Sequence, residues 1–430
     1  MAGILRCSTK DAVLTQKEGC AVEYGLIGQT LGHSFSPFIH KGMGIEQYEL
    51  CPMEPDALGA FLCRGDFKGL NVTIPYKQAV MPYCKELSPR AKSIGCVNTI
   101  LKRSDGSLYG ENTDYYGLLS LARQAGISFL GKRVLILGSG GTSLTARAVA
   151  EGEGASQITV VSRRGPVTYE QLGSYVNTQV IINTTPVGMF PHNGVAPIEL
   201  SLFPHCEGVL DVVYNPLKTE LILEAESRGV PCAGGLWMLV AQAWKADELF
   251  LGHSILQELA QKVYQELAQK QKNIVLIGMP GSGKTSVGRA LAQALSRPFV
   301  DTDVQIEARA GKPIPQIFSE DGEPVFRSYE SQAIAEAGAA TGTVIAIGGG
   351  GAMTEQNRRS LAQNATIVLL ERKQSALQLG KGRPLSTDAN AVTELWNKRM
   401  PVYRAFAHLL ADNNGAMEDT VAWIKKECIK

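Results

Sequence analysis

The stretch G-M-P-G-S-G-K-T, Gly278 to Thr285, decides the fold of the C-terminal part of the chain. It fits the pattern G-x-x-x-x-G-K-[ST] and lies between the apolar run N-I-V-L-I (273–277) and the helix-forming segment S-V-G-R-A-L-A-Q-A-L (286–295). A strand, a glycine-rich loop and a helix in this order direct backbone N–H groups and a helix N-terminus at an anion. The segment therefore predicts the phosphate-binding loop of a nucleotide-binding domain.

The residues of this loop have distinct expected tasks. The Lys284 ammonium would reach the β and γ phosphates of a nucleotide, and the Thr285 hydroxyl would ligate Mg²⁺. The backbone that cradles the phosphates is expected to come from Gly278, Gly281, Ser282 and Gly283.

Outward from the loop, short apolar runs alternate with helix-length segments, which is typical of parallel α/β sheets. The runs end in glycine or polar residues, and open α/β sheets bind their ligands at that edge. The expected strands are 134–138, 158–162, 180–186 and 208–214 in the middle third, and 273–278, 298–303, 343–350 and 366–371 in the last third.

Residues 256–273 join these two groups of strands. Leu259, Val263 and Leu267 recur every fourth residue, which predicts one amphipathic helix. We place the main domain boundary next to its end, near 270–272. A chain of 430 residues has room for more than one domain on either side.

Composition narrows the class of protein. The formal net charge of +1 gives no sign of a nucleic-acid or membrane partner. The first twenty residues contain no apolar run typical of a signal peptide, and no segment reaches the roughly 18 apolar residues that span a bilayer. The nine cysteines contain no C-x-x-C pair. We expect reduced thiols and a cytoplasmic protein, and we leave the oligomeric state open.

Five further segments follow the phosphate loop in order. They are D-T-D (301–303), G-E-P-V-F-R-S-Y-E (322–330), I-G-G-G (347–350), R-P-L (383–385) and R-M-P-V-Y-R (399–404). With the loop, this series resembles shikimate kinases from residue 273 nearly to the C-terminus. The resemblance implies a P-loop domain with a parallel sheet flanked by helices, and ATP with Mg²⁺.

Shikimate is a small carboxylate with three hydroxyls, so its pocket needs planar cations and an acceptor carboxylate. The resemblance implies that Arg327 and Arg399 hold the substrate carboxylate, with Glu330 orienting Arg327. Gly349 and Gly350 would allow close backbone approach. A related kinase, such as one acting on gluconate, is an alternative, but the paired arginines favour a rigid carboxylate.

The resemblance also assigns the groups around phosphoryl transfer. Asp303 would accept a substrate hydroxyl and orient it for attack, and Asp301 would hold Mg²⁺ through water. Arg383 would lie in a lid and stabilise charge on the phosphates.

A second glycine turn lies in V-L-I-L-G-S-G-G-T-S-L-T-A-R-A-V (134–149), again between a strand and a helix. It is expected to bind a dinucleotide through Gly138, Ser139, Gly140 and Gly141. The next strand ends before Arg163 and Arg164, where an NAD enzyme would place Asp or Glu. Two guanidinium groups suit a 2′-phosphate, so the sequence favours NADP.

Six segments around this turn carry a second resemblance. They are G-L-I-G-Q-T-L-G-H-S-F-S-P-F-I-H (25–40), N-V-T-I-P-Y-K (71–77), G-C-V-N-T-I (95–100), N-T-D-Y-Y-G (112–117), D-V-V-Y-N-P-L (211–217) and G-L-W-M-L-V-A-Q (235–242). Together they resemble shikimate dehydrogenase from about residue 24 to 261. The resemblance implies a substrate-binding subdomain (20–118 plus 236–270), a Rossmann NADP-binding subdomain (119–235) and, after them, the kinase domain (272–430).

Reduction of a ketone needs a hydride on carbon and a proton on oxygen. The resemblance assigns this task to Lys77 and Asp114, with the carboxylate orienting the ammonium. Whether Lys77 donates the proton or acts as an electrostatic group stays open. Ser34 and Ser36 would bind the substrate carboxylate. The remaining contacts implied are Thr73, Asn98 and Gln242 to hydroxyls, Tyr214 near substrate and nicotinamide, and Met238 on the nicotinamide.

The two resemblances together predict a bifunctional enzyme. It would reduce 3-dehydroshikimate to shikimate with NADPH and then phosphorylate the 3-hydroxyl of shikimate with ATP. One alternative is a non-catalytic regulator that senses shikimate or quinate, but such a protein has no need of Lys77, Asp114, Lys284 and Asp303 together. Another is a quinate/shikimate dehydrogenase using NAD, joined to a related small-molecule kinase.

Overall fold

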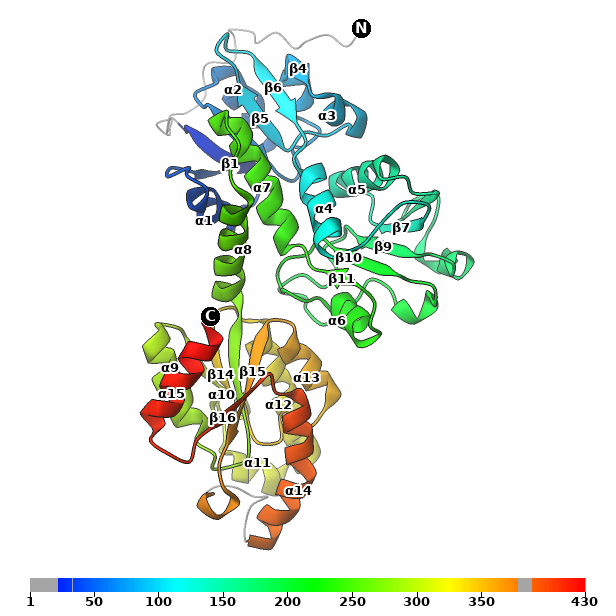
Figure 1. Ribbon diagram of the computed structural model, residues 1–430. Helices are drawn as coiled ribbons and strands as arrows, with labels where there is room; N and C mark the ends of the chain where they lie inside the picture. Colours follow the sequence, from blue (N-terminus) through cyan, green and yellow to red (C-terminus); the bar gives the residue numbers. More distant parts are fainter. Residues whose placement is uncertain (1–21, 33, 378–388, 430) are drawn as a thin grey trace. The chain divides into compact units, whose positions relative to one another are not determined.

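A computed structural model describes residues 22–32, 34–377 and 389–429 of the chain (Figure 1). The chain divides into two compact units. The second unit contains Ala268–Lys430 with the short segments Val187–Ala196 and Asn215–Leu223, and the first contains the rest. Two sheets lie in the first unit and a third lies in the second.

The first sheet contains β1 (Tyr24–Gly28), β2 (Glu49–Pro52), β3 (Gly69–Val72), β4 (Glu86–Leu87), β5 (Thr99–Lys102) and β6 (Leu108–Glu111). It is mixed, in the order β2-β1-β3-β5-β6-β4, because β5 runs antiparallel to both β3 and β6. Successive side chains of β1 point to opposite faces. Ile27 joins a core cluster with Leu58 and Leu62, whereas Leu26 joins one with Phe250.

The second sheet is parallel throughout, in the order β11-β10-β9-β7-β8. Its strands are β7 (Arg133–Leu137), β8 (Gln157–Val161), β9 (Val180–Asn183), β10 (Gly208–Asp211) and β11 (Cys232–Ala233). The chain turns from β7 to β8 on one side and later returns to β9 on the other. The carboxyl end of β7, where ligands of such sheets bind, is therefore the switch point of the strand order.

The helices of this part of the chain are α1 (Ser36–Gly42), α2 (Pro55–Arg64), α3 (Pro89–Ile94), α4 (Asp114–Gln124), α5 (Gly141–Gly152), α6 (Glu220–Ser227), α7 (Leu236–Leu251) and α8 (Gln257–Gln271). Short 3₁₀ turns lie at Met81–Tyr83, Tyr169–Tyr175 and Leu200–Leu202. Helix α7 packs closely on α4 and also contacts α1.

The third sheet is parallel, in the order β13-β14-β12-β15-β16. Its strands are β12 (Asn273–Ile277), β13 (Phe299–Asp301), β14 (Val344–Ala346), β15 (Ala365–Glu371) and β16 (Leu409–Asp412). Its helices are α9 (Lys284–Leu295), α10 (Thr302–Ala310), α11 (Ile314–Glu320), α12 (Glu323–Ala339), α13 (Glu355–Ala362), α14 (Ala389–Phe406) and α15 (Met417–Cys428), with a 3₁₀ turn at Gln374–Ala376.

Alternation along β12 explains why helices cover both faces of this sheet (Figure 1). Ile274 and Leu276 pack in one core cluster with residues of α9 and α15. Val275 and Ile277 pack in another with residues of α12, α13 and α14. Both faces are therefore buried, as an all-parallel sheet requires.

The predicted fold class is confirmed, and every strand expected from the sequence is present, most of them shorter than their apolar runs. The predicted domain boundaries stay a prediction. The helix expected over 256–273 is α8, but Leu259 is 36 % exposed while Ala260 and Val263 are buried. Since a four-residue repeat advances 400° around a helix, it drifts off the buried face.

The structure bears on two expectations drawn from the composition, the absence of a membrane-spanning segment and the reduced state of the thiols. No helix among the described residues is long and apolar enough to cross a bilayer. Six of the described cysteines are free, but Cys63 is disulfide-bonded. The expectation that all the thiols are reduced is therefore wrong at Cys63.

Candidate active sites

The first site centres on an ion pair between Lys77 and Asp114. Lys77 follows the carboxyl end of β3, and Asp114 is the first residue of α4. The Lys77 Nζ lies 2.6 Å from Asp114 Oδ2, and the side chains are only 15 % and 10 % exposed. Two charges held this close and this dry interact more strongly than a pair at the surface.

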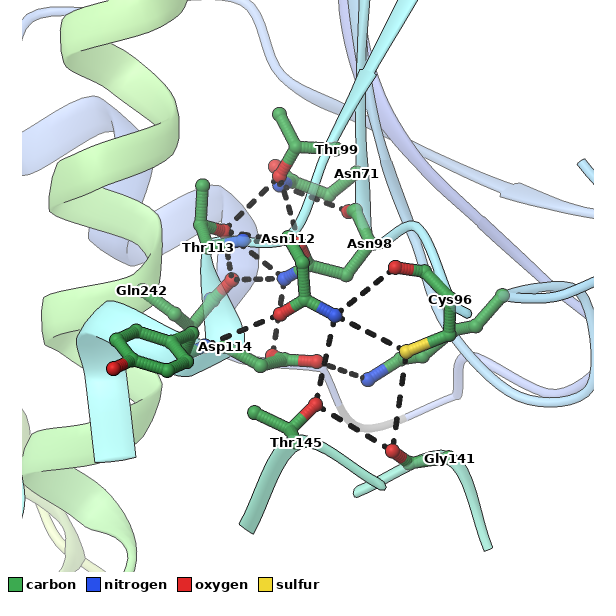
Figure 2. A network of polar contacts seen from close by, with 12 residues as sticks. Asn71, Cys96, Asn98, Thr99, Asn112, Thr113, Asp114, Gly141, Thr145 and Gln242 are labelled. Carbon is green, nitrogen blue, oxygen red and sulfur yellow. Dashed lines mark hydrogen bonds and ion pairs between the residues drawn. The ribbon is translucent and has the colours of Figure 1, made fainter. Parts of the chain in front are cut away.

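Asn98 holds the carboxylate of this pair in place (Figure 2). Its Oδ1 accepts from the Thr113 backbone N–H at 2.6 Å. Its Nδ2 donates to Asp114 Oδ1 at 3.0 Å and to Gln242 Oε1, on α7, at 3.3 Å. The structure therefore brings together Asn98, Asp114 and Gln242, three of the residues predicted for this site.

Burial and charge act in opposite directions on Lys77. Desolvation works to lower the pKa of its ammonium, but the charge and hydrogen bond of Asp114 raise the pKa above its ordinary value. The side chain is therefore a cation at neutral pH, and its ammonium donates to Asp114 Oδ2. This state suits both proton donation and stabilisation of negative charge on a carbonyl oxygen.

Ser34 and Ser36 lie at the start of α1, and the Ser34 Oγ donates to the Ser36 Oγ at 3.1 Å. The ring of Phe35, between them, meets Tyr214 edge-on with centroids 5.9 Å apart. Tyr214 follows β10 of the second sheet, so this ring contact joins residues next to the two sheets of the first unit. Thr73 follows β3, and its backbone N–H donates to Ile27 O at 2.9 Å.

The dinucleotide turn lies next to Lys77. Gly138 follows β7 with φ +106°, a left-handed conformation that suits glycine. A Cβ on Gly141 would lie 3.8 Å from Lys77 Cδ, whereas one on Gly140 would meet no atom within 4 Å. This open glycine turn at the start of α5 fits a pyrophosphate beside the Lys77–Asp114 pair.

The other expected cofactor residues flank this turn. Arg163 and Arg164 are exposed directly after β8, where a 2′-phosphate would be met. Met238 is buried on α7, and a Cβ on Gly117 of α4 would lie 3.2 Å from Met238 Cγ. Ser139 lies within the turn, between Gly138 and α5.

The second site is built on the loop between β12 and α9. Gly278, Gly281 and Gly283 have φ values of +147°, +82° and +95°, so they adopt conformations that side chains disfavour. The Lys284 Nζ donates to the carbonyl oxygens of Gly278 and Met279 at 2.9 and 3.1 Å. This geometry curls the loop around the space that a phosphate would fill.

A hydroxyl and a carboxylate meet beside the loop. The Thr285 Oγ1 donates to Asp301 Oδ2 at 2.7 Å. No group of three or more His, Cys, Asp or Glu side chains that could hold a metal occurs in the described chain. The oxygens of Thr285 and Asp301 are ligands that Mg²⁺ accepts, and nucleotide phosphates would complete its coordination.

A cavity of about 320 Å³ joins this loop to the expected acceptor pocket. The predicted residues that line it are Gly281, Gly283, Lys284, Thr285, Asp301, Asp303, Arg327, Gly349, Gly350 and Arg399. Arg327 Nη1 donates to Glu330 Oε2 at 2.7 Å, so Glu330 contacts the guanidinium that it was predicted to orient. Gly278 and Ser282 belong to the loop but do not line the cavity, and Arg383 lies outside the described residues.

Asp303 has an unusual protonation equilibrium. Burial and the nearby Asp301 carboxylate raise its pKa to about 6, although Lys284 works to lower it. A carboxylate that titrates near neutrality can accept a proton from a hydroxyl and release it again. The position of Asp303 in the cavity with Lys284 and Arg399 places this acceptor among the groups that would hold substrate and phosphate.

Comparison with known proteins identifies both halves. The family pattern "Shikimate dehydrogenase substrate binding domain" matches residues 26–100, and "Shikimate kinase" matches residues 280–429. A shikimate dehydrogenase (NADP(+)) of Clostridium perfringens is 35 % identical over 266 residues, which cover 57 % of this chain and 97 % of that protein. The chain belongs to the shikimate dehydrogenase family.

Solved structures agree with this assignment. Shikimate dehydrogenase 1 of Peptoclostridium difficile is 37 % identical, with a TM-score of 0.52 over 57 % of this chain and 97 % of its own. The enzyme of Thermus thermophilus in complex with NADP(H) and shikimate is 28 % identical, with a TM-score of 0.52 over 57 % and 99 %. A shikimate kinase domain follows the dehydrogenase in this chain, so the fusion predicted from the sequence is confirmed.

Several residues at the dehydrogenase site were not singled out from the sequence. They are Asn71, Cys96, Thr99, Asn112 and Thr113 (Figure 2). Asn112 Nδ2 donates to Cys96 O at 3.1 Å, and Cys96 Sγ lies 3.9 Å from Gly141 O, so these residues join the substrate side to the dinucleotide turn. All of them stand inside segments already quoted, but nothing in the sequence separates their side chains from structural polar residues.

The kinase cavity has additional lining residues that sequence reasoning missed, namely Pro280, Ser286, Ile314, Phe318, Phe326, Ala346, Ile347, Gly348 and Arg372. Ile314 and Phe318 lie four residues apart on α11 and present one apolar face. In the sequence, two apolar residues four positions apart directly after Pro313 indicate the apolar face of a short helix, and this pattern could have pointed to them.

Gly350 offers a prediction on the acceptor pocket. A Cβ at this position would lie 2.9 Å from Arg327 Cζ, so Gly350→Ala must displace the guanidinium. Loss of a charge-assisted contact of this kind is expected to raise the KM for shikimate about 10- to 100-fold. Steady-state kinase assays measure this effect. Gly415→Ala is the matched control, because a Cβ there meets no atom within 4 Å, and an equal effect of both changes would contradict the assignment.

Proposed function

We propose that the chain reduces 3-dehydroshikimate to shikimate with NADPH and then phosphorylates the 3-hydroxyl of shikimate with ATP and Mg²⁺. The observation that carries the first activity is the buried Lys77–Asp114 pair beside the dinucleotide turn. The second rests on one cavity that contains the phosphate loop, Asp303 and two arginines.

In the first reaction NADPH supplies the hydride. Lys77 contributes the positive charge and the proton at the carbonyl oxygen, and Asp114 orients the Lys77 ammonium. Asn98 and Gln242 would bind substrate hydroxyls, and Asn98 Nδ2 contacts both Asp114 Oδ1 and Gln242 Oε1. Ser34 and Ser36 would receive the substrate carboxylate with neutral hydroxyl donors, and Tyr214 packs against the residue between them.

In the second reaction ATP supplies the phosphoryl group. Asp303 holds the acceptor hydroxyl and takes its proton, while Arg327 and Arg399 hold the shikimate carboxylate. Lys284 would leave the loop carbonyls for the phosphates, and Thr285 with Asp301 would hold Mg²⁺. We assign a lid role to Arg383 from the family resemblance alone.

Separate assays of the purified chain test the two activities. NADPH oxidation that requires 3-dehydroshikimate, and ADP release that requires shikimate and Mg²⁺, are the expected results. The exposed arginines after β8 favour NADPH over NADH. Tight binding of shikimate without turnover would instead support a sensor, and equal use of NADH and quinate would support the quinate/shikimate alternative.

The pKa of Asp303 gives a pH prediction for the kinase. The proton acceptor must be ionised, and its pKa is raised to about 6, so the kinase rate is expected to fall about tenfold per pH unit well below pH 6 and to level off above it. The kinase rate at saturating ATP and Mg²⁺, followed across this pH range, measures the decline. The residual rate of Asp303→Asn should not show this decline at low pH. If the decline persists in that variant, it arises from the titration of another group.

A further inference from the structure

The proposed reaction does not use a buried hydrogen-bonded pair of the dehydrogenase unit, His40 and Asp247. His40 Nδ1, on α1, lies 2.5 Å from Asp247 Oδ1, on α7, and both side chains are almost fully inaccessible. The described residues offer no hydrogen bond to His40 Nε2 or Asp247 Oδ2. The two side chains therefore depend on each other, because loss of one leaves a buried polar group without a partner.

The first connection to the active site starts at His40. Its ring stacks on Tyr48 with centroids 3.8 Å apart and planes within 9°. The Tyr48 hydroxyl donates to Asn71 Oδ1 at 2.7 Å, and Asn71 Nδ2 donates to Thr99 Oγ1 at 3.2 Å. The Thr99 hydroxyl in turn donates to Asn98 Oδ1 at 3.2 Å (Figure 2).

Burial and the nearby Asp247 carboxylate raise the pKa of Tyr48 well above its usual value. Its phenol therefore keeps the proton that it donates to Asn71.

The second connection runs along α7. Asp247 faces α1, whereas Gln242, five residues earlier, faces Asn98 at 3.3 Å. Five residues correspond to a rise of roughly 7.5 Å along the helix. The hydrogen bond between His40 and Asp247 thus fixes α7 against α1 close to Gln242, which would bind a substrate hydroxyl. It also fixes α1, whose first residue, Ser36, lies one turn before His40 on the same face.

The two connections meet at Asn98, which binds Asp114 of the reactive pair. We propose that His40 and Asp247 are positioning residues of the dehydrogenase site, which set α1 and α7 at the spacing that 3-dehydroshikimate requires. This inference rests on the proposed dehydrogenase function. Both side chains are almost fully inaccessible, so the pair would act through Ser36, Gln242 and Asn98.

The test separates positioning from folding with three variants of the full chain. His40→Leu/Asp247→Leu replaces the buried pair with apolar residues, a change that buried ion pairs often tolerate without loss of stability. Asp247→Asn keeps an oxygen that accepts from His40 Nδ1. Trp244→Phe is the matched control, since it removes a different hydrogen bond of α7, from Trp244 Nε1 to Ile255 O at 3.0 Å.

The double variant is expected to bind 3-dehydroshikimate more weakly, which raises the KM for this substrate about tenfold. The KM for NADPH, the thermal midpoint and the kinase rate should stay near those of the parent. Asp247→Asn is expected to recover most of the parent KM, and Trp244→Phe to leave it unchanged. A merely structural role would lower only the amount of active enzyme, and hence the maximal rate. A folded double variant with an unchanged KM would overturn the inference.

The thermal midpoint of each variant reports whether its dehydrogenase unit is folded, because the kinase activity comes from the other unit. If the parent itself does not oxidise NADPH, the proposed function fails separately. Calorimetric titration with 3-dehydroshikimate then decides the inference, in an Arg327→Ala background that weakens the kinase site. Weaker binding by the double variant supports positioning, and equal binding refutes it.

Discussion

Lys77→Ala is expected to slow the reduction of 3-dehydroshikimate about 10²- to 10⁴-fold at saturating substrate. The change removes the cation that pairs with Asp114 at 2.6 Å and lies beside the dinucleotide turn. It leaves the carboxylate buried and without its counter-charge, so the environment becomes less favourable for negative charge on the carbonyl oxygen. Steady-state NADPH oxidation measures the effect.

The kinase rate of Lys77→Ala should stay within the error of the parent, because the substituted residue belongs to the other unit. Lys85→Ala is a matched control in the same unit. Lys85 also pairs with an aspartate, Asp105, at 3.2 Å, but both side chains are more than half exposed. A pair of this kind contributes little. Similar losses from both substitutions would contradict the role assigned to Lys77.

Lys284→Ala is expected to slow the phosphorylation of shikimate about 10²- to 10³-fold. In the structure the ammonium binds two carbonyl oxygens of its own loop, so it is held where phosphates would arrive. Its removal takes a full positive charge from the site of transfer, where charge stabilisation dominates catalysis. ADP release with shikimate at saturating ATP and Mg²⁺ measures the loss.

Lys425→Ala provides the comparison for Lys284→Ala. Lys425 also donates to a backbone carbonyl, that of Ala294 at 3.1 Å, but it lies on exposed surface away from the loop glycines. Its removal should leave both activities unchanged. A Lys284→Ala chain that kept more than a tenth of the kinase rate would show that the loop backbone alone suffices.

The sequence was most informative where the residues of one functional site follow one another in a single segment. The phosphate loop needs strand, glycines, lysine and threonine in one segment, so Gly278 to Thr285 could be read without the fold. The inner strands β9, β10, β12 and β14 of the two parallel sheets are buried on both faces and therefore appear as continuous apolar runs. The first sheet showed no such signal, because strands such as β4 (Glu86–Leu87) are short and the sheet is mixed.

The polar network could not be predicted for a different reason. Asn71, Asn98, Asp114 and Gln242 come from four separate segments of the chain, and their contacts depend on how α4 and α7 pack. His40 and Asp247 stand 207 residues apart in the sequence. A histidine after an apolar helix turn and an aspartate in an apolar helix have no visible relation until the fold brings them together. The four-residue repeat of apolar residues wrongly placed Leu259 on the buried face of α8, because side chains four residues apart do not point in the same direction around a helix.

The central claim is that one chain carries out two consecutive reactions. Incubation of the purified chain with 3-dehydroshikimate, NADPH, ATP and Mg²⁺, followed by mass spectrometry of the products, tests it most directly. The account predicts shikimate 3-phosphate from the parent, shikimate alone from Lys284→Ala, and unreacted 3-dehydroshikimate from Lys77→Ala. A parent chain that leaves 3-dehydroshikimate unchanged, or that accumulates shikimate without phosphorylating it, would contradict the account.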